Sequence, residues 1–203
     1  WACIGFTITT AACNLAATFV AHACGQIEVM MSHLDTLFDD IDETNEIVKN
    51  RLGFVVKSHV RVLRLTTMIE MLFREICLSD VVASILIICL LEYCCIVEWE
   101  NSDTLAIITY LELFLSMVFN MFIFCHIGEL LKERCHQVGK AAYTMDWYRL
   151  PGKTSLTIIM IMAIANSPRK MTAGRLMELS MSSFGSIIKT SFAYLNMLRT
   201  MTD

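Results

Sequence analysis

Hydroxyl and thioether side chains recur along one line of the C-terminal segment. At 100° per residue, they fall within about 40° of one direction around a helix. The members of this 183–201 stripe are Ser183, Ser186, Thr190, Ala193, Met197 and Met201. Hydroxyls can help to hydrate an ion along a pathway, and a ring of apolar side chains can close a pathway by dewetting. The other interpretation is that the small residues let a neighbouring helix pack closely.

Three ionisable residues lie inside apolar runs of the chain: Glu92, Glu112 and Lys189. A charge within a bilayer is costly and commonly marks a functional site. At 1.5 Å per residue, Glu92 lies about 9 Å and Glu112 about 12 Å from the ends of their runs that adjoin the short segment 98–103. The two carboxylates either share one polar or wet region, or bond separately to neighbouring helices, or one is held protonated. Lys189 lies about 80° from Met197 around a helix, so we expect it to reach the interface or a polar partner.

Other reactive residue types form no recognisable site in the sequence. It contains no nucleophile elbow, phosphate loop or metal cluster, and no basic cluster typical of nucleic-acid binding. Most of the cysteines lie within apolar runs, where a free cysteine behaves as a small hydrophobe. These are Cys3, Cys13, Cys24, Cys89, Cys94, Cys95 and Cys125. We therefore predict a protein that is not an enzyme, needs no cofactor or metal, and has no nucleic-acid partner.

Long apolar runs define the elements that carry these residues. Hydrophobic residues make up 56% of the chain and charged residues only 18%, and the mean hydropathy is +0.57, which is rare for a soluble domain. A helix that crosses a bilayer needs about 20 apolar residues. Runs of that length cover 1–27, 77–97, 104–128 and 171–201, whereas the run 155–165 is too short. The prediction is an all-α, polytopic membrane helical bundle of about four spans with a cytoplasmic helical anchor region.

Lysine and arginine residues orient these spans. They gather in the segments 32–76 and 131–153, whereas the short acidic loop 98–103 has none. By the positive-inside rule, the two basic segments are cytoplasmic and the loop is external. The predicted order is span 1–31, cytoplasmic amphipathic helices 32–76, span 77–97, external loop 98–103, span 104–130, cytoplasmic anchor segment 131–170, and a last span with the C-terminus, 171–203. This order predicts a multi-pass protein of the cell membrane whose C-terminus is extracellular.

An apolar stripe also runs through the first basic segment. Its members recur at helical spacings and are Ile41, Val48, Leu52, Val55, His59 and Leu63. The spacing predicts a long amphipathic helix that packs on another helix. We expect His59 to be a core histidine rather than a ligand or a switch. The acidic cluster 39–43 predicts a turn or a helix start, where acids suit the helix dipole.

The C-terminal third of the chain carries an ordered series of short motifs. They are Tyr143-Thr144-Met145-Asp146-Trp147-Tyr148-Arg149-Leu150-Pro151, Asn166-Ser167-Pro168, Met171-Thr172-Ala173-Gly174, Leu179-Ser180-Met181, Phe184, and Ile187-Ile188-Lys189-Thr190-Ser191-Phe192-Ala193-Tyr194. This series resembles the C-terminal signature of the insect odorant receptor family. The stretches 22–26 and 59–65 also look like that family, so the resemblance covers essentially the whole chain. Family members usually have serine and an aromatic residue around the last tyrosine, and residues 192–195 depart from this in side-chain detail.

The resemblance implies a seven-helix protein with a cytoplasmic N-terminus and an external C-terminus, the orientation that lysine and arginine also indicate. This chain would then be a C-terminal fragment holding spans four to seven. Members form tetrameric, ligand-gated cation channels, so the implied partners are an odorant small molecule, the lipid bilayer and an odorant co-receptor subunit in a heterotetramer. The last helix of the family is split, and the run 155–165 would be its cytoplasmic part.

The resemblance also assigns roles along the last helix and in the anchor segment. The 183–201 stripe would line the pore, and Met197 and Met201, matched to the family through Tyr194, would form an external hydrophobic gate. The anchor residues Tyr143, Trp147 and Tyr148 would pack where four subunits meet. Without the resemblance, an interfacial aromatic belt is the simpler interpretation of these aromatics.

The family holds odorant in the outer half of its helix bundle, partly between its fourth and sixth spans. In this chain, depth and residue type give the candidates Phe6, Ile108, Tyr110, Phe114 and Met117. Pockets of this kind are mostly apolar with few polar contacts. Each of these side chains can equally be a core or lipid-facing residue.

Three other functions compete with an odorant-gated channel. A transporter often has broken helices at the midplane and internal repeats, but the broken element here lies on the cytoplasmic side and the halves show no repeat. A gustatory-type receptor channel is the alternative within the same broad class, although the tail fits odorant receptors better. A structural membrane scaffold would use the cytoplasmic helices as its functional part.

Overall fold

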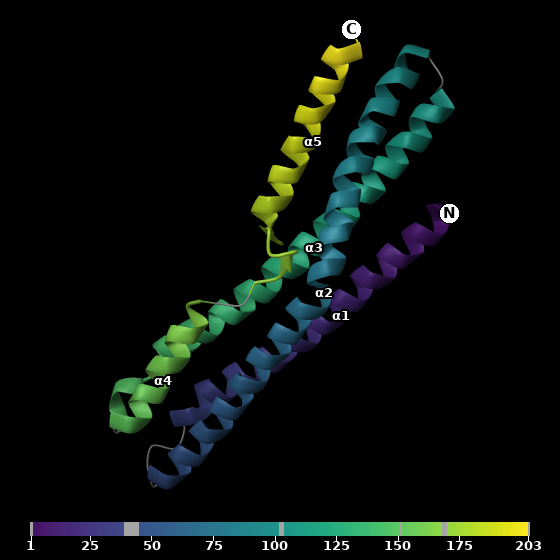
Figure 1. The fold of residues 1–203 in the computed structure, drawn as a ribbon. Helices are drawn as coiled ribbons and strands as arrows, with labels where there is room; N and C mark the ends of the chain where they lie inside the picture. Colours follow the sequence, from purple (N-terminus) through teal and green to yellow (C-terminus); the bar gives the residue numbers. More distant parts are fainter. Residues whose placement is uncertain (1, 39–44, 102–103, 151, 168–169, 203) are drawn as a thin grey trace. The chain divides into compact units, whose positions relative to one another are not determined.

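The computed structural model describes residues 2–38, 45–101, 104–150, 152–167 and 170–202. These residues are almost entirely helical, which confirms the all-α class (Figure 1). The α-helices are α1 Ala2–Asp35, α2 Asn45–Asn101, α3 Thr104–Thr144, α4 Gly152–Ala165 and α5 Met181–Thr202, and the 3-10 turns are η1 Thr36–Phe38 and η2 Trp147–Arg149. The strands β1 Thr172–Ala173 and β2 Met177–Glu178 form a small antiparallel hairpin before α5.

In the described part of the chain, three helices are long and apolar enough to cross a membrane. They lie at Thr7–Asp35, Val48–Glu98 and Thr104–Thr144. The 14 residues of α4 extend about 21 Å, short of the ~30 Å of a bilayer core. Although α5 has 22 residues, it is not one of the three, and serine, threonine and Lys189 lie among its apolar residues. That α5 crosses the bilayer therefore remains a prediction.

Residues 45–101 form one uninterrupted helix of 57 residues, which is about 85 Å long. It joins the predicted amphipathic segment to the predicted span 77–97, because no proline lies between them to end the helix. The amphipathic stripe is present, since Leu52, Val55 and His59 are buried, which agrees with the core role expected for His59. The predicted turn at 39–43 lies outside the described residues.

The chain divides into two compact units. Unit 1 contains residues 1–15, 72–129 and 172–203, and unit 2 contains residues 16–71 and 130–171. In unit 2, α4 packs closely on the second half of α3, where a Cβ placed on Gly139 would lie 3.1 Å from the Cβ of Ala165. The first half of α2 packs on α1, where the rings of His33 and Phe54 lie 4.8 Å apart.

In unit 1, the hairpin is held against α2 at Gly174. Its backbone N–H donates to the carbonyl oxygen of Arg74 at 3.1 Å. Gly174 has a φ of 59°, a conformation that glycine adopts without strain. A Cβ at Gly174 would also lie 2.6 Å from the Cδ2 of Leu78. The turn therefore needs glycine both for its backbone conformation and for its contact with α2.

Candidate ligand cavity and ion pathway

The start of α5 is fixed by Ser180. The backbone N–H of Ser183 donates to the Oγ of Ser180 at 3.2 Å, and the two hydroxyl oxygens lie 3.1 Å apart. Ser180 therefore caps the helix by binding one of the N–H groups that the first turn leaves unpaired. The cap fixes where the first turn begins, and with it the direction in which the 183–201 stripe points.

One face of α5 packs within unit 1 and another is exposed. Ile187 and Ser191 are buried, and the ring of Phe184 contacts that of Phe122 edge-to-face, with centroids 5.7 Å apart. Most of the stripe lies on the exposed side: Ser183 is half-buried, Ser186, Thr190 and Ala193 are exposed, and Met197 is 53% exposed. The side chain of Met201 lies outside the described residues. The stripe thus does not serve as a packing face within this unit.

The hydroxyl groups of Ser186 and Thr190 on the stripe have a defined orientation. Ser186 donates to the carbonyl oxygen of Ser182 at 3.1 Å, and Thr190 donates to that of Ser186 at 2.8 Å. A hydroxyl has one proton and two lone pairs. With the proton bonded along the helix, each oxygen presents only lone pairs outwards. The outward lone pairs attract a cation, whereas these hydroxyl groups have no free proton to donate to an anion.

Behind the stripe, Glu92 of α2 meets the buried face of α5. Glu92 is 7% exposed, and the hydroxyl of Ser191 donates to its Oε1 at 3.3 Å. The carbonyl oxygen of Ile188 lies 2.9 Å from the same hydroxyl. The Oε2 of Glu92 is buried and has no hydrogen-bond partner among the described residues. The buried carboxyl group therefore links two helices that are far apart in sequence.

Replacing Ser191 by alanine is expected to destabilise the protein by about 1–3 kcal/mol, because it removes a donor to a buried carboxyl group. The melting temperature of the purified full-length protein in detergent measures this effect. Ser186→Ala is the matched control, since that hydroxyl is exposed and bonds only within α5. Equal melting temperatures for the two variants would show that the link between Glu92 and Ser191 contributes no stability.

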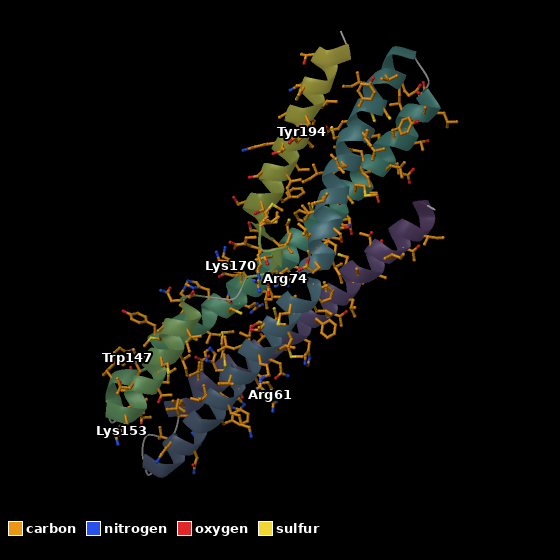
Figure 2. The ribbon with its side chains drawn as sticks, in the orientation of Figure 1. Arg61, Arg74, Trp147, Lys153, Lys170 and Tyr194 are labelled. Carbon is orange, nitrogen blue, oxygen red and sulfur yellow. The ribbon has the colours of Figure 1, made fainter. Side chains whose placement is uncertain are left out.

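The other two charges that the sequence predicts within the membrane have different surroundings. Glu112 on α3 and Lys189 on α5 are both exposed, unlike Glu92. Tyr194, from which the resemblance predicts the gate positions, is also exposed on α5 (Figure 2). The sequence did not indicate Ser191 as the partner of Glu92, because Ser191 lies off the stripe and 99 residues away.

A cavity of about 420 Å³ lies in unit 1 between α1, α2 and α3. This volume is within the ~300–1,000 Å³ typical of small-molecule sites. Its apolar walls come from Gly5, Ala83, Ile87, Leu91, Leu113 and Met117, and its polar groups from Thr9, Asp80, Ser84 and Asn120. Mostly apolar walls with a few polar groups are the usual composition of a ligand pocket.

Of the five residues proposed from the sequence for a ligand pocket, Met117 lines this cavity. Tyr110 and Phe114 are half-exposed, and Ile108 is exposed. The side chain of Phe6 lies outside the described residues. The sequence reasoning missed Asp80 and Asn120, although a polar residue within a long apolar run was a usable signal.

Two polar atoms at this cavity lack partners. The Oδ2 of Asp80 and the Nδ2 of Asn120 are buried, and neither has a hydrogen-bond partner among the described residues. An unpaired buried polar atom costs free energy. These two side chains therefore stand out among the four polar residues of a mostly apolar site.

The anchor aromatics lie in unit 2, around the turn between α3 and α4 (Figure 2). Tyr143 is 70% and Tyr148 is 67% exposed. The hydroxyl of Tyr148 donates to Asp146 Oδ1 at 3.0 Å, and its ring meets that of Trp147 with centroids 6.4 Å apart. Tyr143 also borders a groove with His136, Gly139 and residues of α4. Large exposed aromatic side chains beside a groove are typical of a protein–protein contact.

Metal and disulfide chemistry are not indicated in the described residues. No group of three or more His, Cys, Asp or Glu side chains there is placed to hold a metal ion. The cysteines whose side chains are described are free thiols, and Cys13, Cys77, Cys125 and Cys135 are buried. They pack as small apolar side chains.

Long apolar helices and a ligand-sized cavity between them define a multi-pass helical membrane protein. The family model described as 7tm Odorant receptor matches residues 1–192. The chain therefore belongs to the 7tm odorant receptor family of insects.

Individual relatives agree with this assignment. The chain is 23% identical over 190 residues to odorant receptor 22c of Drosophila melanogaster, a match that covers 88% of this chain and 46% of that protein. It is 22% identical over 175 residues to odorant receptor 10 of Aedes albopictus, covering 86% and 46%. The chain thus spans about half the length of these relatives.

Solved structures show the same fold. The olfactory receptor OR5 of Machilis hrabei, in complex with eugenol, superposes with a TM-score of 0.66 at 19% identity, over 88% of this chain and 46% of that one. A second structure of OR5 from Machilis hrabei superposes with a TM-score of 0.67 at 20% identity, over 86% of this chain and 45% of that one.

Proposed function

We propose that this chain is part of an odorant receptor subunit that forms an odorant-gated cation channel with a shared co-receptor in a heterotetramer. The observation that carries the proposal is the 183–201 stripe of α5, whose described members from Ser186 to Met197 are exposed although Ile187 and Ser191 on another face of the helix are buried. An exposed polar helix face in an apolar membrane protein needs water or a partner. A central pore, bordered by α5 from each subunit, supplies both.

The chemistry of the stripe supports cation passage. Ser186 and Thr190 present oxygen lone pairs outwards because their protons are bonded along the helix. Met197 lies further towards the C-terminus and presents an apolar side chain. A ring of such side chains, with Met201 beyond it, would close the pore by dewetting. Lys189 lies to one side of this line and does not enter the ion pathway.

The cavity of unit 1 is the proposed odorant site. Its volume and apolar walls suit a small, weakly polar molecule. One structural relative, OR5 of Machilis hrabei, was solved in complex with eugenol, a molecule of that kind. Odorant binding between α1, α2 and α3 would act on α5 through the contact of α2 with α5 at Glu92 and Ser191.

The remaining surfaces are assigned to assembly and orientation. Tyr143, Trp147 and Tyr148 are proposed to contact neighbouring subunits in the cytoplasm. The lysines and arginines of unit 2 favour a cytoplasmic position for it. In this orientation, α5 crosses the cell membrane and its C-terminus is extracellular.

The test is a current recording from cells that express the full-length protein together with the co-receptor. A panel of volatile odorants is expected to evoke an inward cation current for at least one compound. Cells that express the co-receptor alone provide the control. A protein that reaches the cell surface but adds no odorant-evoked current to that of the co-receptor would contradict the proposal, and uptake of an odorant without current would indicate a transporter.

A further inference from the structure

The polar groups of the cavity limit the chemistry of its occupant. Asp80 and Asn120 both line the cavity, and each has a buried polar atom without a partner among the described residues. Rotation about the terminal bond of either side chain exchanges the two atoms of its polar group, so Asp80 presents a carboxyl oxygen to the cavity in either orientation, and Asn120 can present its amide nitrogen. The carboxyl oxygen accepts a hydrogen bond, and the amide nitrogen donates one.

We infer that this cavity selects apolar molecules that carry a hydroxyl group, which donates to Asp80 and accepts from Asn120. The inference rests on the proposed function, since it names the class of odorant for the same cavity. A hydroxyl group has both a proton and lone pairs, so a ligand with one hydroxyl group has a donor for Asp80 and an acceptor for Asn120. The apolar part of the ligand then lies along Ile87, Leu91, Leu113 and Met117.

Other functional groups match the cavity less well. A ketone or an ester accepts from Asn120 but leaves Asp80 unpaired, and a hydrocarbon leaves both unpaired. An ionised acid would bring a negative charge towards the carboxyl group of Asp80, and no lysine or arginine is among the described residues that line the cavity. An ammonium ion would pair with Asp80 but must first lose its hydration in an apolar site, which is costly.

The experiment compares probes with the same chain length on the full-length protein expressed with its co-receptor. The probes are octanol, octanone, octane and octylamine, and the measured quantity is the concentration for half-maximal current. Octanol is expected to act at a concentration about 10-fold lower than octanone, because its hydroxyl group can donate a hydrogen bond to Asp80 and a ketone cannot. An equal or lower concentration for octanone, octane or octylamine would overturn the inference.

Two variants separate the roles of the polar residues. Asp80→Leu is expected to raise the half-maximal concentration of octanol about 10-fold and to leave that of octanone nearly unchanged. Asn120→Leu is expected to raise both. If Asp80→Leu fails to reach the surface, Asp80→Asn, which keeps an acceptor oxygen, is expected to retain the preference for octanol. Equal shifts for all probes in Asp80→Leu would mean a structural role and would overturn the inference.

Failure of the inference can be told apart from failure of the proposed function. If other odorants evoke current but octanol shows no advantage over octanone, the hydroxyl preference is wrong and the channel function stands. If no odorant evokes current from a protein at the cell surface, both are wrong. Ile87→Val is the matched control in the apolar wall, and it is expected to change the response to all probes alike.

Discussion

Gly128→Ala is expected to prevent α5 from docking and to remove most of the protein from the cell surface. A Cβ at position 128 of α3 would clash with the backbone carbonyl oxygen of Leu179 and would lie 2.8 Å from its Cβ. These atoms belong to the backbone and its first side-chain carbon, so they cannot move aside alone. Leu179 is buried and directly precedes Ser180, which caps α5. The added methyl group therefore displaces the start of the helix, at a cost of about 1–3 kcal/mol or more.

Surface labelling and the melting temperature of the full-length protein measure this effect. Gly53→Ala is the matched control, because a Cβ there has nothing within 4 Å and alanine favours a helix over glycine by about 1 kcal/mol. The control is expected to keep or slightly raise the melting temperature. If Gly128→Ala behaved like Gly53→Ala, the close contact between α3 and Leu179 would not be needed for folding.

Met197→Ser is expected to give a current in the absence of odorant, several times larger than that of the native protein. The proposed gate excludes water because its side chains are apolar, and a hydroxyl group there would let water and ions enter. Met197 is 53% exposed within its own unit, so the substitution removes little internal packing. The holding current before odorant application, and its block by removing permeant cations, provide the measurement.

Phe192→Ser is the control for this variant. Phe192 is also exposed on α5, but it lies about 140° from the direction of the stripe. It is expected to leave the resting current unchanged. A resting current in both variants would indicate general loosening of α5, and a silent Met197→Ser channel at normal surface level would place the gate elsewhere.

The sequence predicted what depends on composition and helical spacing. Apolar runs predicted a helical membrane protein, and the spacing of Leu52, Val55 and His59 predicted a face that is buried in the structure. The C-terminal motifs predicted the family, which the match over residues 1–192 confirms. Apolar runs, helical spacing and short motifs are each formed by residues close together in the chain, so they can be recognised in a single sequence.

The sequence did not predict features that depend on distant contacts or on very short elements. The sequence predicts one long apolar segment over 171–201, whereas the structure has a hairpin at 172–178, because strands of two residues have no detectable periodicity. Gly174 was the available signal, since glycine often marks a turn. The pairing of Glu92 with Ser191, and the meeting of Asp80 and Asn120 at one cavity, depend on how the helices pack in three dimensions.

The hydrogen bonds within α5 have a consequence for the proposed pore. Ser186 and Thr190 hold their protons against the helix backbone, so in that pore the oriented dipoles of neutral groups, rather than fixed charges, would discriminate between ions. Hydroxyl groups do not titrate near neutrality. The proposed channel would therefore keep its preference for cations when the fluid outside the cell becomes acidic, whereas a ring of carboxylates would lose it by protonation.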